Sequence, residues 1–234
     1  MKTDIFIKIV FLILFAYAIA PTAIIRLGRV GAVSRAPKGN GKVALTFDDG
    51  PDPRYTPQIL DVLSLYQVKA CFFVVGSKAR NQPELVRRIV REGHEIGNHG
   101  LGHKVLWLLG PCATVREIAG ANRIIEEITG EGVRLYRPAW GLFNIFSIYY
   151  CRLKALQVVL WTYMSWDWVK RATPESITRK VFDRVRDGTI LVLHDSDSTP
   201  GAAEGGSARV VAALPHILDG LKQRGLQVAP WRKL

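Results

Sequence analysis

The chain alternates short apolar runs with longer segments in which apolar residues recur every three or four positions. The short runs predict strands over residues 43–47, 70–75, 95–97, 135–137, 157–161, 190–193 and 226–228. The longer segments predict helices over residues 56–66, 83–92, 114–129, 144–156, 174–186 and 208–224. Strands that alternate with helices in this way predict an α/β fold of parallel strands joined by right-handed crossovers.

Polar residues at the strand ends help to distinguish an open sheet from a barrel. Asp48, Asp49, Arg137, Asp167 and His194 lie at or just after the C-terminal ends of predicted strands. Catalytic groups occupy this rim in βα barrels. The chain has no G-x-G-x-x-G or P-loop sequence that would indicate a nucleotide-binding sheet. We therefore expect a distorted seven-unit (β/α) barrel, preceded by an N-terminal apolar helix.

The first 25 residues form a separate apolar segment, which we interpret as a membrane anchor or signal segment. Residues 26–41 are predicted to be a linker, and residues 42–230 a catalytic domain. Small residues at 16–18 or 18–20 could precede a signal cleavage site. Pro21 disfavours the second site, and the apolar run approaches the roughly 17 to 25 residues that span a bilayer. We favour an uncleaved anchor, with a secreted protein as the result of cleavage.

The orientation of this segment is less well determined. Positive residues after it, at positions 26, 29, 35, 38 and 42, outnumber those before it. Loop charge alone would place the domain in the cytoplasm, but large domains translocate regardless of such charges. We expect the catalytic domain to be extracytoplasmic.

Composition narrows the choice of partners. With 234 residues and 48% hydrophobic content, the chain can form one domain with a large core. The net charge of +12 suits acidic lipid headgroups or a wall polymer. Because this charge is scattered over predicted helices and forms no binding module, we expect no nucleic-acid partner. Three widely spaced cysteines predict buried free thiols. We expect a monomer.

Two acidic residues and a histidine pair suggest a metal site. Asp48 and Asp49 end an apolar run, and His99 and His103 follow about fifty residues later. A catalytic zinc takes three protein ligands and leaves a position for water, so Asp49 and the two histidines fit as ligands. Asp48 then remains free to accept a proton from water. Taken alone, Asp-Asp-Gly-Pro is a turn signal and a histidine pair is often incidental; their combination favours the metal site.

Three further segments carry candidate chemistry. Arg137 could bind Asp48 through its guanidinium, and the turn after it could direct backbone N–H groups at an oxyanion. Trp166 to Trp168 could form an apolar wall around the buried Asp167. His194 could titrate near neutrality and protonate a leaving amine. The ordinary alternatives are a solvated arginine, core tryptophans and a core histidine.

Together these motifs, in this order over residues 42–228, resemble those of the polysaccharide deacetylase family, the NodB-type carbohydrate esterases. The matching segments are Thr46-Phe47-Asp48-Asp49-Gly50, His99 to His103, Arg137 to Gly141, Asp167-Trp168 and Val192-Leu193-His194. The resemblance implies that Asp48 is the base and that the metal ligands are Asp49, His99 and His103.

The resemblance also implies roles for the later motifs. Arg137 would support the base, and Asp167 would hold His194, the general acid. The Trp140 backbone amide would stabilise the oxyanion. Trp168 would line the acetyl pocket, and Val192, at the usual leucine of the last motif, is a further predicted substrate contact.

The resemblance implies a metal-dependent hydrolase, with Zn²⁺ as the most suitable metal. Such an enzyme would remove N-acetyl groups from the N-acetylglucosamine units of an envelope glycan such as peptidoglycan or a chitin-like oligomer. Apolar stretches at 105–109 and 142–161 are the basis of a second alternative, in which the protein deacylates an amino sugar linked to a lipid carrier. A noncatalytic glycan-binding envelope protein is a third alternative. Its support is Gly100, where the family usually has Ser or Thr. Ala139 and Trp140 also depart from the family pattern but remove no reacting group.

Overall fold

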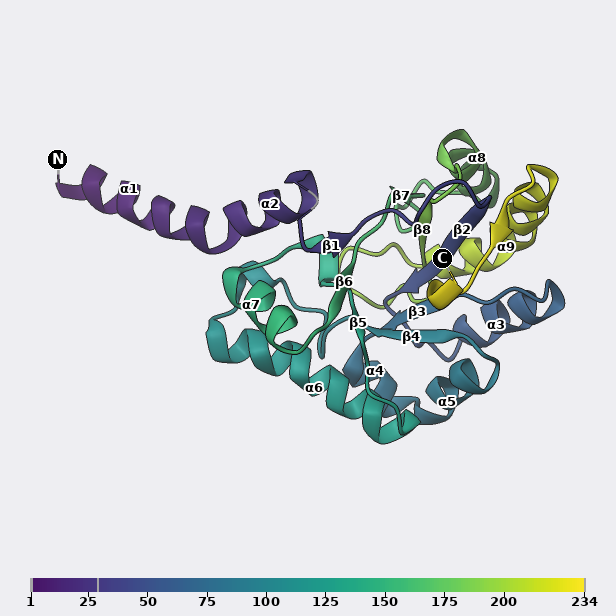
Figure 1. Ribbon diagram of the computed structural model, residues 1–234, viewed down its shortest axis with the longest axis horizontal. Helices are drawn as coiled ribbons and strands as arrows, with labels where there is room; N and C mark the ends of the chain where they lie inside the picture. The colour runs from purple at the N-terminus through teal and green to yellow at the C-terminus, as the bar shows by residue number, and fades with distance from the viewer. Residues whose placement is uncertain (1, 29, 234) are drawn as a thin grey trace.

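A computed structural model describes residues 2–28 and 30–233, and its strands form one curved parallel sheet (Figure 1). The order is β1-β6-β5-β4-β3-β2-β8-β7, with β9 beside the start of β2. The strands are β1 Ala32–Val33, β2 Lys42–Asp48, β3 Cys71–Val74, β4 Glu95–Asn98, β5 Leu135–Tyr136, β6 Gln157–Val159, β7 Tyr163–Met164, β8 Ile190–His194 and β9 Gln227–Val228. All of these pairings are parallel, so the carboxyl ends of the strands meet at one rim.

Helices cover the outside of the curved sheet (Figure 1). They are α3 Thr56–Leu65, α4 Gly76–Asn81, α5 Pro83–Arg91, α6 Pro111–Thr129, α7 Ile145–Leu153, α8 Pro174–Arg184 and α9 Gly206–Gln223, with short 3₁₀ turns η2 Leu106–Leu108, η3 Ala139–Gly141 and η4 Trp231–Lys233. The main core lies between the central strands and α3, α8 and α9, and includes Phe47, Phe72 and Leu191. Burial of these apolar faces stabilises the layers and fixes the register of β2 against β3 and β8.

The predicted distorted α/β barrel is confirmed, with two additional strands and one additional helix. β1 and β7 have two residues each, and α4 has six. Such short elements give no hydrophobic period that a sequence pattern can detect. The predicted strand at residues 157–161 ends at Val159 because the chain leaves the sheet there, and it re-enters at Tyr163 on the other side of β8.

The N-terminal apolar segment forms a long helix with two different environments. It comprises α1 Lys2–Leu14, a π-helical stretch η1 Phe15–Ile19 and α2 Ala20–Gly28. Residues Asp4–Gly28 are long and apolar enough to cross a membrane, by length and composition. α1 projects away from the domain (Figure 1), whereas Ala18 and Ile25 are buried against it.

Hydrogen bonds join α2 to the domain. Thr22 Oγ1 donates to the carbonyl oxygen of Phe143 and accepts from its N–H, at 3.0 and 2.9 Å. The same oxygen accepts from Trp107 Nε1 at 2.9 Å. The connection after α2 is also part of the domain, because β1 pairs with β6 and buried Ala36 donates its N–H to Gly188 O at 2.9 Å. Within residues 26–41, predicted as a linker, Ala32, Val33 and Ala36 are therefore bonded to the domain.

The three cysteines are free, but only two are buried. Cys71 and Cys151 lie in the core, in agreement with the prediction. Cys112 is exposed in the first turn of α6, so its predicted burial is wrong.

Candidate active site

The site begins where β2 ends, at the centre of the rim. Asp48 is the last residue of β2 and pairs with Phe73 on one side and His194 on the other. Asp49 has φ 79° and turns the chain out of the sheet. At Gly50 a Cβ atom would lie 2.0 Å from Asp195 Oδ2, so a residue with a side chain does not fit there. The Asp-Asp-Gly sequence thus places two successive carboxylates at the rim.

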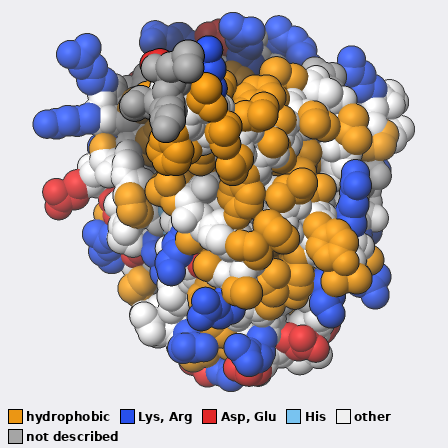
Figure 2. Space-filling view, turned by 90° about the vertical axis from the view of Figure 1, so that its left-hand side faces the viewer, with side chains coloured by type: hydrophobic (Ala, Val, Ile, Leu, Met, Phe, Trp, Pro, Cys, Tyr) orange, Lys and Arg blue, Asp and Glu red, His pale blue; other side chains and the backbone are white. Residues whose placement is uncertain are grey.

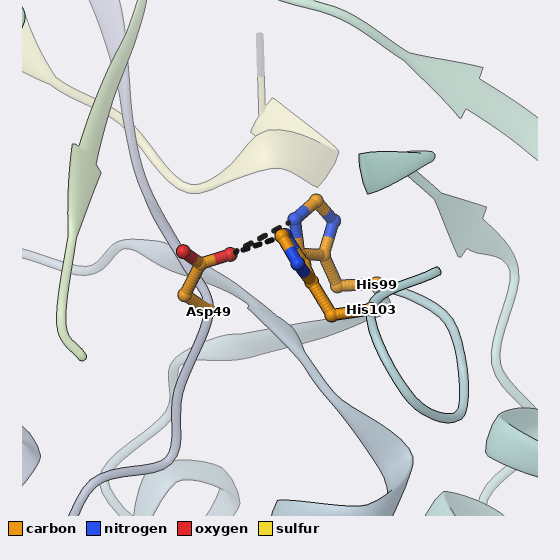
Figure 3. A group of neighbouring side chains, drawn as sticks. All are labelled: Asp49, His99 and His103. Carbon is orange, nitrogen blue, oxygen red and sulfur yellow. Dashed lines mark ion pairs between the residues drawn. The ribbon is translucent and has the colours of Figure 1, made fainter. Parts of the chain in front are cut away.

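Asp49, His99 and His103 converge on one point (Figure 3). Asp49 Oδ1 lies 3.2 Å from His99 Nε2 and 3.0 Å from His103 Nε2. The three donor atoms lie within 4.8 Å of one another, and all three residues are buried. A carboxylate and two imidazoles form a ligand set that suits zinc and neighbouring divalent metals. These residues therefore fit the predicted metal centre in both chemistry and geometry.

The electrostatics of this group favour a charged carboxylate. Burial raises the pKa of Asp49, but hydrogen bonds from His103 and His99 outweigh it and hold the pKa well below its usual value. Burial likewise opposes protonation of His99, whereas the Asp48 and Asp49 carboxylates raise its pKa. Asp49 is therefore ionised, and a cation bound here would have to displace the proton that the carboxylates favour on His99.

Asp48 is held by Arg137 instead of by the histidines. Arg137 is fully buried, and its Nη1 lies 2.6 Å from Asp48 Oδ1. The other carboxylate oxygen, Oδ2, lies 4.0 Å from His99 Nε2. Asp48 therefore directs one oxygen at the guanidinium and one toward His99, an arrangement that suits the predicted base beside a metal site.

His194 lies on the opposite side of the rim with its own carboxylate partner. Its Nδ1 is 3.0 Å from Asp167 Oδ2, and its backbone N–H donates to the same oxygen at 2.9 Å. Ser165 Oγ donates to Asp167 Oδ1 at 2.8 Å. Burial opposes the charged imidazole, but Asp167 and then Asp49 and Asp48 outweigh it and raise the pKa of His194 to about 10. The imidazolium is thereby favoured at neutral pH.

One cavity of about 110 Å³ joins these groups. Among the predicted site residues, its wall includes Asp48, Asp49, His99, His103, Trp140, Trp168 and His194. The ring centroids of Trp140 and His103 are 4.3 Å apart, and those of Trp168 and His194 are 5.1 Å apart. Arg137 and Asp167 lie behind the wall and hold Asp48 and His194.

Val192 does not line this cavity. It is fully buried in β8, where it pairs with Thr46 and Met164. The predicted contact of Val192 with substrate therefore has no exposed surface to form it, because the side chain packs within the barrel.

Comparisons with known proteins agree with this geometry. A family model described as polysaccharide deacetylase matches residues 35–159, more than half of the chain. The chain belongs to the polysaccharide deacetylase family. The chitooligosaccharide deacetylase of Sinorhizobium fredii is 35% identical over 86% of this chain and 94% of its own length. The peptidoglycan-N-acetylglucosamine deacetylase of Bacillus cereus is 36% identical over 81% of this chain and 85% of its own.

A solved structure shares the fold. The crystal structure of a peptidoglycan N-acetylglucosamine deacetylase has a TM-score of 0.81 and 31% identity, covering 89% of this chain and 94% of that one. The family resemblance predicted from the motifs is thus confirmed, and this polysaccharide deacetylase is a member of an enzyme family whose chemistry depends on a metal.

Glu117 supports the loop of this deacetylase that carries His99 and His103. Its Oε1 accepts from the backbone N–H groups of Gly102 and Lys104, at 2.7 and 3.3 Å. Gly100 has φ +87°, and a Cβ atom there would lie 2.9 Å from Glu117 Oε1. The departure at Gly100 therefore provides the space that a buried carboxylate occupies. His99 has a separate support, since its Nδ1 lies 2.7 Å from Arg137 O.

Sequence reasoning missed four residues that lie around Asp49, His99 and His103. Thr199 Oγ1 donates to Asp49 Oδ2 at 2.5 Å, and Lys78 Nζ donates to Asp49 O at 2.8 Å. Glu117 braces the loop, and Asp195, whose pKa burial raises to about 7, accepts from Thr56 Oγ1 at 2.6 Å. Only Asp195 had a local signal, its position next to His194.

Proposed function

We propose that this protein removes N-acetyl groups from N-acetylglucosamine units of an envelope glycan of the peptidoglycan or chitin-like type. The observation that carries the proposal is the convergence of Asp49, His99 and His103 in the wall of a cavity that also contains Asp48 and His194. A ligand group, a free base and an acid with a raised pKa around one small cavity are what amide hydrolysis needs. The names of the relatives agree with this choice of substrate.

Asp49, His99 and His103 would hold the cation, for which we propose Zn²⁺. A zinc ion bound there would supply Lewis acidity and lower the pKa of a water molecule. The remaining chemistry belongs to side chains. Asp48 accepts the proton of the attacking water at Oδ2, because Oδ1 is hydrogen-bonded to Arg137 Nη1.

The later steps use the other walls of the cavity. The backbone N–H of Trp140, the middle residue of the 3₁₀ turn η3, is the proposed donor to the tetrahedral oxyanion. Asp167 engages Nδ1 of His194, which leaves Nε2 to protonate the departing sugar nitrogen. The C–N bond breaks as this proton transfers, and the products are acetate and a free amine.

We also propose that the N-terminal helix is an uncleaved anchor and that the catalytic domain is extracytoplasmic and monomeric. The support is the length and apolarity of Asp4–Gly28, together with the buried packing of Ala18 and Ile25. A helix that serves only as a signal needs no hydrogen bonds to the mature domain, whereas Thr22 forms three with Phe143 and Trp107.

Acetate release from a panel of N-acetylated glycans, with metal analysis of the same protein, tests this function. We expect zinc-dependent release from N-acetylglucosamine polymers and none from Asp48→Asn. If wild type and Asp48→Asn show the same negligible release while both bind glycan, the noncatalytic envelope protein is the correct alternative.

A second candidate substrate is an amino sugar on a lipid carrier. The observation that favours it is the contact between the anchor and the cavity wall, in which Arg26 Nη1 donates to Trp140 O at 3.3 Å. Release of acetate from a lipid-linked N-acetylated sugar and not from soluble oligomers would establish this alternative.

A further inference from the structure

The helix α7 has an apolar stripe on its exposed side. Ile145, Tyr149 and Leu153 follow one another at intervals of four residues, and they are 51%, 65% and 63% exposed. Leu108 of η2 is 83% exposed. A helix on a water-facing surface normally exposes its polar side and buries its apolar side. The exposed apolar side of α7 therefore requires a partner.

This stripe lies beside the base of the N-terminal helix. η1 contacts both η2 and α7. The Tyr17 ring lies 6.1 Å from that of Phe146, its hydroxyl donates to Leu109 O, and Asn144 Nδ2 donates to the Tyr17 hydroxyl at 3.2 Å. Figure 2 shows the face from which the helix projects, with hydrophobic side chains gathered over it and Lys and Arg side chains around its edge.

The length of the projecting helix determines how deep this face must lie. The free part, α1, has 13 residues and is about 20 Å long at about 1.5 Å per residue. The hydrocarbon core of a bilayer is about 30 Å thick. The missing length, roughly 10 Å by the same figures, must come from η1 and the start of α2, where the domain already packs. A spanning helix thus draws the surrounding surface of the domain into the membrane interface.

The charges near the stripe suit an anionic lipid surface. Arg152 and Lys154 are exposed at the end of α7, and Arg26 is exposed near the end of α2. α7 contains no acidic residue. Basic side chains beside an apolar stripe are attracted to acidic headgroups, by about 1 kcal/mol each near a membrane surface.

We propose that the face formed by η2 and α7, with Leu108, Ile145, Tyr149 and Leu153 exposed, is a second membrane contact that lies in the lipid interface around the anchor. This inference rests on the proposed membrane anchoring. It also fixes the orientation of the active site, because the segment from Trp140 in the cavity wall leads directly to Asn144, the N-cap of α7. The cavity is then held at the lipid surface, where membrane-proximal glycan is presented.

Labelling in vesicles tests this contact. The full chain with Cys112→Ser leaves only the buried Cys71 and Cys151, so a cysteine introduced by Tyr149→Cys accepts a fluorescent label selectively. The labelled protein is reconstituted in phosphatidylcholine–phosphatidylglycerol vesicles with and without bromine on the acyl chains. Leu65→Cys, at a 78% exposed apolar site on α3, is the matched control. Leu153→Cys provides a second test position.

The expected result is emission shifted to shorter wavelength and quenched by brominated lipid at positions 149 and 153, with neither effect at position 65. Emission at 149 and 153 equal to that at 65 overturns the proposal. A shift without quenching also overturns it, since that result means contact with protein, such as a second copy. Acetate release by the same samples separates the two claims: release without quenching refutes the membrane contact alone, and quenching without release refutes the proposed activity alone.

Discussion

Nη1 of Arg137 lies 2.6 Å from Oδ1 of Asp48 inside a closed network of hydrogen bonds. The same guanidinium donates to Thr46 Oγ1, Val159 O and Leu160 O, at 2.8, 3.0 and 3.1 Å. It thus connects Asp48 on β2 to the end of β6, where the chain leaves the sheet. A charge buried in this way is stable because it is both paired and hydrogen-bonded.

Arg137→Lys should therefore weaken both stability and activity. Lysine keeps the charge but cannot reach all four acceptors, and buried carbonyl groups without a donor cost about 1–3 kcal/mol. We expect a lower midpoint of denaturant unfolding together with reduced acetate release. The exposed Arg134→Lys is the control, and an equal unfolding midpoint for both variants would contradict the network.

Asp48→Asn and Asp49→Asn should separate the base from the ligand. Asp48→Asn removes the proton acceptor and should reduce acetate release by about 10²-fold or more, while metal content stays at the wild-type level. Asp49→Asn should lose both the metal and the activity. Metal analysis after dialysis, beside the assay, checks the assignment, which loss of metal from Asp48→Asn would disprove.

Asp167→Asn should move the alkaline limb of the pH–rate profile. If His194 is the general acid as proposed, its reactive form is the protonated one, so kcat/KM falls as the pH rises through the pKa of His194. Burial opposes protonation, but Asp167 is the largest of the charges that raise this pKa to about 10. Without that charge the limb should shift to lower pH, whereas the exposed Asp183→Asn should leave it in place. A limb that does not move would exclude His194 as the acid.

Glu117→Ala should weaken metal binding although Glu117 is not a ligand. The loop that carries His103 would lose the acceptor for two N–H groups, and loss of such support typically costs 10–100-fold in affinity. Glu117→Gln keeps an acceptor oxygen and should retain most of the affinity. Glu127→Ala on the exposed side of α6 is the control. Competition with a chelator measures all three variants.

Gly100→Ser should destabilise this protein even though serine is the family's usual residue. The left-handed backbone costs a residue with a side chain about 1–2 kcal/mol, and the added Cβ would crowd Glu117. The double variant Gly100→Ser with Glu117→Ala should recover part of the loss. Thermal unfolding gives the comparison, and full additivity of the two losses would show that the positions are independent.

Much of the fold and site was predictable because the relevant signals are local. β2 and β8 are continuous apolar runs that end in polar residues, so both their existence and their reactive ends can be found in the sequence. The roles of Asp48, Asp49, His99, His103 and His194 remain predictions, but the structure brings these residues to one cavity.

The residues that were missed act through distant contacts. Thr199 is 150 positions from Asp49, and no local pattern links them. Glu117 lies on the buried face of α6, where an acidic residue is not expected, and its carboxylate is satisfied by the glycine-containing loop that packs over it. The strand β1, inside the predicted linker 26–41, was missed for the same reason. A strand of two residues is defined by its pairing with β6 and not by its own sequence.

Only a short connection joins the proposed anchor to the catalytic domain. α2 ends at Gly28 and β1 begins at Ala32, already paired with β6. If the apolar helix is inserted in a membrane as proposed, this short connection holds the catalytic domain at the bilayer surface. An enzyme held in this way would diffuse in two dimensions and would reach only glycan that lies within about one domain thickness of the bilayer.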